Sequence, residues 1–280
     1  MENTGNDKNG SRAPGEAIIF LHVPKTAGTT LNRLIEWEYP ISQMYSVDPV
    51  LFEWSAKHLW KLPKQRLAKT RMFKGHMLFG LHEVLPQPST YITVLRNPVE
   101  RVLSLFRFLK SMPANAIAHL RLDPNFGLEE LLQSRVPENY AQTHNLMCRM
   151  LCGDPALMDD SASVFWTPET APESIQRSLI NLDNMDFGLV EHMSSTLALL
   201  EDAYGLDFRL QEHFINTTVK SRGEGNLDIV HKIVQQNAAD IVLYREASRI
   251  FHARVKGLAT LTQRLNAPSH EYLAYRSRGD

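Results

Sequence analysis

The sequence predicts an α/β fold in which a central parallel sheet is flanked by helices, giving a three-layer architecture. Short apolar runs of strand length recur along the chain. Each is followed by a loop of small or polar residues and then by a helical pattern, an order typical of parallel sheets. The chain has 280 residues, enough for one large domain with a substantial core.

The first unit reads as a strand, a loop and a helix. Residues 17–23 form an apolar run typical of a strand that is buried on both faces. Residues 24–30 interrupt this run, and apolar residues at helical spacing then predict a helix from Leu31 to about Tyr39. We expect a helical segment at 48–70 and a short strand at Met72-Phe73.

The later elements continue this order. Residues 91–96 predict a second clear strand. Asn97 and Pro98 then suit the N-cap and first position of a helix that runs to about Lys110. Beyond it we expect a mainly helical middle, a third strand, a helix behind that strand and one long helix, at residues 128–203, 187–190, 194–204 and 226–255.

Composition and charge exclude several classes of protein. The chain has 30 Lys and Arg residues against 31 Asp and Glu residues, a formal net charge of -1. Without an excess of positive charge, the protein as a whole is not expected to bind nucleic acid. Two cysteines exclude a disulfide scaffold. With no apolar segment long enough to span a bilayer and no signal-peptide pattern, we expect a cytoplasmic protein. Its single domain is expected at 17–265, between a disordered leader (1–16) and a polar tail (266–280).

The loop after the first strand has the pattern of an anion site. Small residues let backbone N–H groups converge, and the positive end of the following helix adds to them. Lys25 supplies a mobile cation but precedes the only glycine of the loop, so this is not a Walker A motif. The predicted ligand is a phosphate or sulfate ester; the alternative is an ordinary turn with a solvated lysine. The candidate residues are Lys25, Thr26, Ala27, Gly28, Thr29 and Thr30.

A second anion site is predicted where the strand at 91–96 ends. Arg96 lies at its carboxyl end, where open parallel sheets bind ligands. Ser104 lies about two turns into the next helix, on the same face as Asn97. The guanidinium fork and the hydroxyl together suit one phosphate. The alternative is an ion pair between Arg96 and a nearby carboxylate such as Glu100.

Residues 19–30 and 94–104 together resemble the two nucleotide-binding segments of sulfotransferases that use 3′-phosphoadenosine 5′-phosphosulfate (PAPS). The residues of these two segments are most similar to those of the carbohydrate branch, which includes the heparan sulfate 2-O- and 6-O-sulfotransferases. This resemblance implies a P-loop-like sulfotransferase fold, PAPS as donor, the desulfated nucleotide PAP as product and no required metal. It also implies a carbohydrate hydroxyl as acceptor. The loop at Lys25 would bind the 5′-phosphosulfate, and Arg96 with Ser104 the 3′-phosphate.

The resemblance also implies a catalytic base. Residues 73–76 are similar to a His-Gly-His segment of the 2-O-sulfotransferases, whose histidines include the base. His76 matches the second histidine, whereas the first position is Lys74, a departure from a two-histidine mechanism. His76 is therefore the expected general base of an in-line transfer, and Lys25 is expected to stabilise the leaving phosphate.

Weaker signals suggest further contacts. Segments at 145–151 and 216–222 also resemble parts of this family. Lys220 and Arg222 are candidate clamps on the nucleotide phosphates, with solvated side chains as the alternative. Two further residues, His82 and Arg149, are candidate contacts with the acceptor.

Other interpretations compete with this one. His144, Cys148 and Cys152 share one face of a possible helix, but buried thiols are expected there rather than a metal. The same chemistry on a lipid, phenol or secondary-metabolite hydroxyl is the first alternative function. A P-loop phosphotransferase and a non-catalytic nucleotide-binding module are the others.

Overall fold

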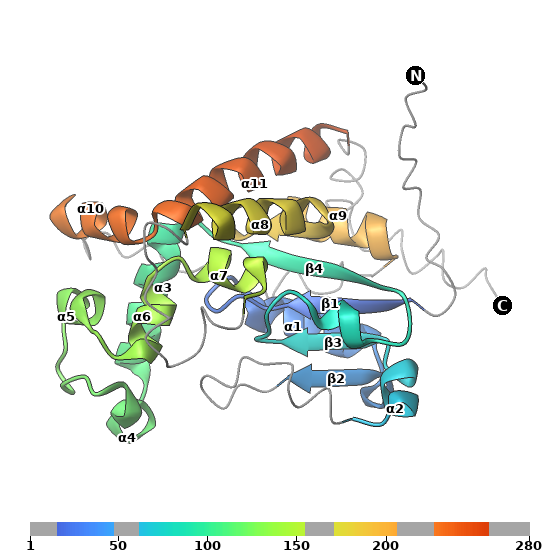
Figure 1. The fold of residues 1–280 in the computed structure, drawn as a ribbon, viewed down its shortest axis with the longest axis horizontal. Coiled ribbons are helices and arrows are strands. Elements are labelled where there is room, and N and C mark those ends of the chain that lie inside the picture. The colour runs from blue at the N-terminus through green and yellow to red at the C-terminus, as the bar shows by residue number, and fades with distance from the viewer. Residues whose placement is uncertain (1–15, 48–61, 155–170, 206–226, 258–280) are drawn as a thin grey trace, which may run out of the picture.

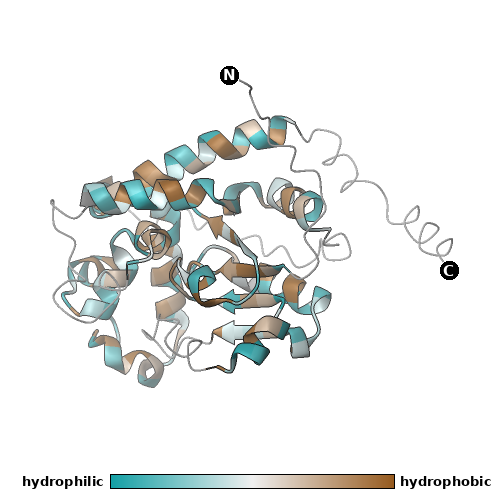
Figure 2. Cartoon of the chain, turned by 45° about the vertical axis from the view of Figure 1, so that its right-hand side comes forward, coloured by the Kyte–Doolittle hydropathy of each residue, from teal (hydrophilic) through white to brown (hydrophobic). Residues whose placement is uncertain are grey.

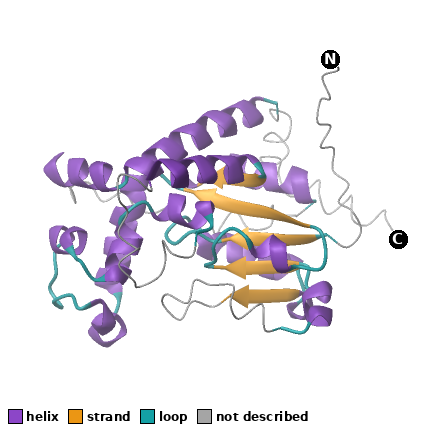
Figure 3. Ribbon diagram, viewed as in Figure 1, coloured by secondary structure: helices purple, strands orange, loops and turns teal. Residues whose placement is uncertain are grey.

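The computed structural model describes residues 16–47, 62–154, 171–205 and 227–257. Within them five strands form one sheet in the order β2-β3-β1-β4-β5, and every neighbouring pair is parallel. Figure 3 shows strands side by side with their arrows pointing the same way. The predicted parallel sheet is confirmed. The strands are β1 (Ala17–Leu21), β2 (Met44–Val47), β3 (Met72–Gly75), β4 (Ser89–Leu95) and β5 (Met185–Leu189).

Helices connect and cover these strands. Among the described residues, no helix is both long and apolar enough to cross a membrane. The α-helices are α1 (Gly28–Glu38), α2 (Lys64–Lys69), α3 (Pro98–Ser111), α4 (Ala114–Ile117), α5 (Leu128–Gln133), α6 (Pro137–Thr143), α7 (Leu146–Cys152), α8 (Ala171–Asp183), α9 (Met193–Tyr204), α10 (Leu227–Gln236) and α11 (Ala238–Lys256).

The central strand β1 shows why the fold has three layers. Its five residues are all buried, and they alternate between two apolar clusters. Ile19 and Leu21 pack with residues of α7, α8 and α11, whereas Ile18 and Phe20 pack with α1 and α9. A strand covered on both faces needs apolar residues at every position, which explains the unbroken apolar run. Figure 2 shows the mainly apolar strands between helices of mixed polarity.

The connections diverge between β1 and β4, which makes this the topological switch point of the sheet. From β1 the chain passes through α1 to β2, which lies at one edge of the sheet. From β4 it continues to β5, which lies at the other edge. Open parallel sheets bind ligands at the carboxyl ends of strands where connections diverge in this way. In Figure 1 the strands point toward the side where α3, α5, α6 and α10 lie, and α2 lies at the opposite end.

The described elements differ from the expected ones at a few places. Strand β2 was not predicted, because it is an edge strand whose residues are only partly buried and lack an apolar run. The long helix expected at 226–255 is instead two helices, broken at Asn237. Of the helix expected at 48–70, α2 covers 64–69, and residues 48–61 lie outside the described part. The leader and the tail expected at 1–16 and 266–280 fall almost wholly outside it too.

Asn237 lies between α10 and α11, and its side chain bonds to the residues around the start of α7. Its Oδ1 accepts a hydrogen bond from the Asn145 amide at 3.0 Å, and its Nδ2 donates to the Thr143 carbonyl at 2.8 Å. In return, Asn145 Oδ1 accepts from the amides of Ala239 and Asp240 at 3.0 and 3.2 Å. Each asparagine therefore satisfies backbone groups near the start of the other helix, which locks α7 to α11.

Candidate functional site

The loop after β1 folds tightly around its own backbone. Lys25 and Ala27 both adopt positive φ, at 69° and 60°. Such conformations are strained for residues other than glycine, and they concentrate at ligand-binding turns. Thr26 is buried, and its hydroxyl donates to the Val23 carbonyl at 2.7 Å. Ala27 occupies the N-cap of α1 and makes no side-chain hydrogen bond to the first amides of this helix, whose positive end faces the loop.

Gly28 is needed because His22 lies against it. A Cβ atom at position 28 would fall 1.5 Å from His22 Nε2 and 2.1 Å from its Cε1. No side chain fits there while the imidazole holds its position. The small-residue pattern of the loop therefore has a second cause besides exposing amides: it admits the ring of His22 from the end of β1.

Arg96 brings the second predicted segment onto the first. Its Nη1 donates to the Lys25 carbonyl at 3.2 Å, although the two residues are 71 positions apart in the chain. Arg96 is 7% exposed and also lies 3.6 Å from Glu100 through Nη2, so the ion pair considered as an alternative is present as well. The contact with Lys25 places both segments at the switch point between β1 and β4.

The cap of α3 fixes Arg96 in this position. As predicted, Asn97 is the N-cap residue, and its Oδ1 accepts from the amides of Val99 and Glu100 at 3.0 and 3.3 Å. Its own amide donates to Glu191 Oε1 at 2.8 Å, which ties the turn to the end of β5. Glu191 and Glu100 are the carboxylates that favour the charged form of Arg96.

Lys25 is enclosed by cations and an aromatic ring. Its Nζ lies 3.9 Å from the centroid of the Phe108 ring of α3. Burial, together with the charges of Arg96 and Arg107, lowers the pKa of Lys25 to about 8. A site that crowds three cations is suited to an anion, which would relieve their repulsion.

The sequence pattern predicted Ser104 as a site residue but not Arg107 or Phe108. All three belong to α3, where Arg107 and Phe108 follow Ser104 by three and four residues and therefore share its side of the helix. The Ser104 side chain is half-buried and has no hydrogen bond within the described part of the chain. Helical spacing from Ser104 is the signal in the sequence by which the other two residues could have been found.

His76 lies at the end of β3, next to β1. Its Nδ1 is 2.7 Å from the His22 carbonyl oxygen, and the two imidazoles stack with centroids 4.3 Å apart. A carbonyl oxygen only accepts hydrogen bonds, so Nδ1 carries the proton and Nε2 of the neutral ring keeps a lone pair. The ring is thus in the form a general base requires at Nε2.

His22 and Lys74 complete the surroundings of His76. Burial lowers the pKa of His22 well below its usual value, and the charges of His76, Lys74 and Lys25 act in the same direction. Lys74, at the position where the resembling segment has its first histidine, forms an ion pair with Glu36 of α1. Lys74 is 7% exposed at its side chain and is held by this partner on the α1 side of the sheet.

The two candidate acceptor contacts are not gathered with these residues. His82 is exposed and bonds through Nδ1 to the hydroxyl of Tyr91, 3.2 Å away, in the amino-terminal half of β4. Arg149 is fully buried, and its Nε donates to the His144 carbonyl at 2.6 Å. A buried arginine with such a bond stabilises the region of α7, and its position does not favour a direct contact with an acceptor.

The residues weighed as metal ligands each have a protein partner. His144 Nδ1 lies 2.9 Å from the Thr143 hydroxyl, and Cys148 Sγ lies 3.0 Å from the Ser178 hydroxyl. Burial raises the pKa of Cys148 well above its usual value, which disfavours the thiolate that binds metals. No group of three potential ligands comes together among the residues that the structure describes.

Lys220 and Arg222 lie outside the described residues, and so does the segment 216–222. Thr29 belongs to the first turn of α1. Thr30, which follows it, is 7% exposed.

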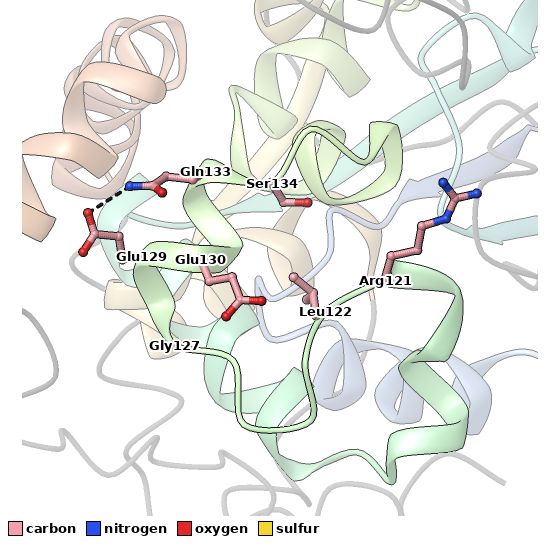
Figure 4. A pocket seen from close by; sticks show the side chains of 7 residues that line it. All are labelled: Arg121, Leu122, Gly127, Glu129, Glu130, Gln133 and Ser134. Carbon is pink, nitrogen blue, oxygen red and sulfur yellow. Dashed lines mark hydrogen bonds between the residues drawn. The ribbon is translucent and has the colours of Figure 1, made fainter.

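A cavity of about 610 Å³ lies away from these residues. Figure 4 shows it at the turn before α5, where Gln133 Nε2 donates to Glu129 Oε1 at 3.0 Å. It is wide open to solvent, and its walls carry two glutamates and one arginine. None of the predicted site residues lines it. The lining residues are Arg121, Leu122, Gly127, Glu129, Glu130, Gln133 and Ser134.

Comparisons with known proteins agree on one family. The model of the sulfotransferase family matches residues 11–149, a stretch that contains Lys25, His76, Arg96 and Ser104. Galactose-3-O-sulfotransferase 3 of Mus musculus is 29% identical over 163 residues, which cover 51% of this chain and 36% of that protein. The Homo sapiens protein of the same name is 28% identical over 155 residues, covering 49% and 34%. The chain therefore matches about a third of the length of these relatives.

One solved structure was also matched. The crystal structure of mouse sulfotransferase SULT7A1 complexed with PAP has a TM-score of 0.36 and 15% sequence identity. The match covers 80% of this chain and 63% of the mouse chain.

Proposed function

Because this chain belongs to the sulfotransferase family, we propose that it transfers a sulfuryl group from PAPS to a hydroxyl of a carbohydrate. The observation that carries the proposal is the hydrogen bond from Arg96 to the Lys25 carbonyl. It joins two segments with anion-binding patterns at the switch point between β1 and β4. One ligand with two separated phosphate groups matches such a pair of sites.

The donor-binding roles follow from the chemistry of each segment. The 5′-phosphosulfate belongs at the start of α1, where Lys25 and backbone amides would offset the charge that grows on the leaving phosphate oxygen. The 3′-phosphate belongs between Arg96 and the half-buried hydroxyl of Ser104, with Arg107 as a third cation nearby. Two anchored phosphates fix the reacting sulfur relative to His76. Lys220 and Arg222 remain candidate clamps on the same nucleotide.

His76 supplies the base. As the acceptor oxygen forms its bond to sulfur and the bond from sulfur to the phosphate oxygen breaks, Nε2 of His76 takes the acceptor proton. The Nδ1 bond to the His22 carbonyl supports this assignment, since it leaves Nε2 unprotonated in the neutral ring. No other group is required to move a proton in this step.

The acceptor is proposed from the relatives. The curated proteins that match are named galactose-3-O-sulfotransferases, so sugars with a terminal galactose head the panel of acceptors to be tested. A phenol, a lipid-linked sugar and an unglycosylated lipid belong in the same panel. Turnover of PAPS with galactose-terminated sugars alone is the expected result, and turnover with the phenol alone would reassign the acceptor.

A His76→Gln variant tests the catalytic role. We expect kcat to fall by about 10²–10⁴, the usual contribution of a general base, while PAP affinity stays within about twofold. His119→Ala, an exposed histidine between α4 and α5, is the matched control and should retain full kcat. Equal losses of PAP affinity and kcat in His76→Gln would remove His76 from the role of base. PAP binding by a protein that never turns PAPS over would favour the non-catalytic module.

A further inference from the structure

His22 and His76 interlock through their backbones at the ends of two adjacent strands. The His22 amide donates to the Gly75 carbonyl at 2.9 Å and extends the β1–β3 ladder by one bond. The His22 carbonyl then accepts the bond from His76 Nδ1 at 2.7 Å. One residue therefore uses both of its backbone groups to set the position of the residue proposed as the base.

The ring of His22 is held as firmly as its backbone. It stacks against His76 with an interplanar angle of 27°, and it lies parallel to Phe20, with centroids 5.4 Å apart and an angle of 15°. Gly28 closes one edge, since even a Cβ atom there would overlap the ring. A ring confined in this way provides a fixed flat surface for the His76 imidazole.

Charge gives the two histidines different roles. The pKa of His22 is lowered chiefly by burial, so His22 stays neutral at pH 7 whether or not its neighbour is protonated. A neutral support adds no full positive charge beside a base that must accept a proton. The charged and titratable groups that face His22 are Lys25 of the loop, Lys74 of β3 with its partner Glu36 of α1, and His76.

We propose that His22 is a positioning residue, which holds the His76 imidazole in its Nδ1–H tautomer and turns Nε2 toward the acceptor. The catalytic consequence rests on the proposed function. The tautomer itself does not, because it can be observed without any turnover. Nothing in the sequence pattern pairs these residues, since 54 positions separate them.

Nitrogen-15 NMR spectra of histidine-labelled protein report the tautomer directly. In the unaltered protein we expect His76 to show a protonated Nδ1 and an unprotonated Nε2. His22→Ala keeps the backbone carbonyl that accepts from His76 Nδ1 but removes the stacked ring. The imidazole of His76 can then turn away from that carbonyl, and its signals should move toward a mixture of both tautomers. In His22→Phe, which keeps a flat ring in the same place, the Nδ1–H form should persist. His119→Ala should leave the His76 signals unchanged.

Kinetics of the same variants separate positioning from binding. His22→Ala should lower kcat by on the order of tenfold to a hundredfold with PAP affinity within about twofold. His22→Phe should recover most of that kcat. A single Nδ1–H tautomer and full kcat in His22→Ala would overturn the proposal. A His22→Phe variant that folds but is as inactive as His22→Ala would also overturn it, by assigning the imidazole nitrogens a direct part. Should the unaltered protein show no turnover, the proposed function fails while the tautomer still tests His22.

Discussion

Lys25 and Arg96 meet through a backbone carbonyl, a contact that compensates neither of their positive charges. The Arg96 guanidinium donates to the Lys25 carbonyl oxygen, and the Lys25 ammonium lies over Phe108. Both cations are thus fixed in place and remain cationic, which is the arrangement that binding of an anion requires. The position of its charges, more than the number of basic residues, distinguishes this site from the rest of a nearly neutral protein.

Replacing Arg96 with alanine should weaken PAP binding. We expect a loss on the order of tenfold to a hundredfold, or about 1.5–3 kcal/mol, the usual value of a hydrogen bond to a charged group. Calorimetric titration with PAP measures it. Arg66→Ala, an exposed arginine of α2 beyond the opposite edge of the sheet, is the matched control. Unchanged affinity in Arg96→Ala would leave the ion pair with Glu100 as the role of this residue.

PAP affinity should also decline at alkaline pH. The pKa of Lys25 in the free protein is lowered to about 8, so above that pH the ammonium must be protonated before it can hold a phosphate. The affinity should be flat below the pKa and fall by at most about tenfold per pH unit above it. Calorimetry between roughly pH 6.5 and 9.5 records this slope. Lys25→Arg, which stays charged throughout, should abolish the slope, and the same slope in both proteins would trace the effect to another group.

At the scale of elements, most of what the sequence predicted lay in buried strands. The run at 17–23 and the strand at 91–96 were recognisable because both faces of each strand are covered. The edge strand β2, Met-Tyr-Ser-Val, gives no such pattern. The break at Asn237 could not be predicted either, because its purpose is a set of hydrogen bonds to residues more than 90 positions away.

The junction of β1 and α1 depends on glycine at position 28. Gly28→Ala should destabilise the protein by about 1–3 kcal/mol, the usual cost of overpacking, and displace His22. Urea unfolding measures the stability, and the His76 tautomer reports the displacement. Gly127→Ala is the control, since a Cβ atom there meets nothing within 4 Å. Equal stability and unchanged His76 signals in Gly28→Ala would show that His22 is not packed as described.

At the scale of the whole molecule, topology assembles the site. Three residues with anion-binding or proton-transfer chemistry follow β1, β3 and β4, and a parallel sheet brings those carboxyl ends to one edge. The sequence alone therefore placed Lys25, His76 and Arg96 at this edge. It did not place the neighbours that these residues meet in three dimensions, namely the His22 ring, Arg107 and Phe108, because strand order and helix packing decide those contacts.

The central claim is that the β1 loop and the start of α3 bind one doubly phosphorylated nucleotide. A crystal structure of the protein with PAP tests it most directly. We expect a single PAP molecule with its 5′-phosphate at Lys25 and the start of α1, and its 3′-phosphate at Arg96 and Ser104. A PAP molecule bound elsewhere, such as in the cavity of Figure 4, with Lys25 and Arg96 touching no phosphate, would contradict the claim.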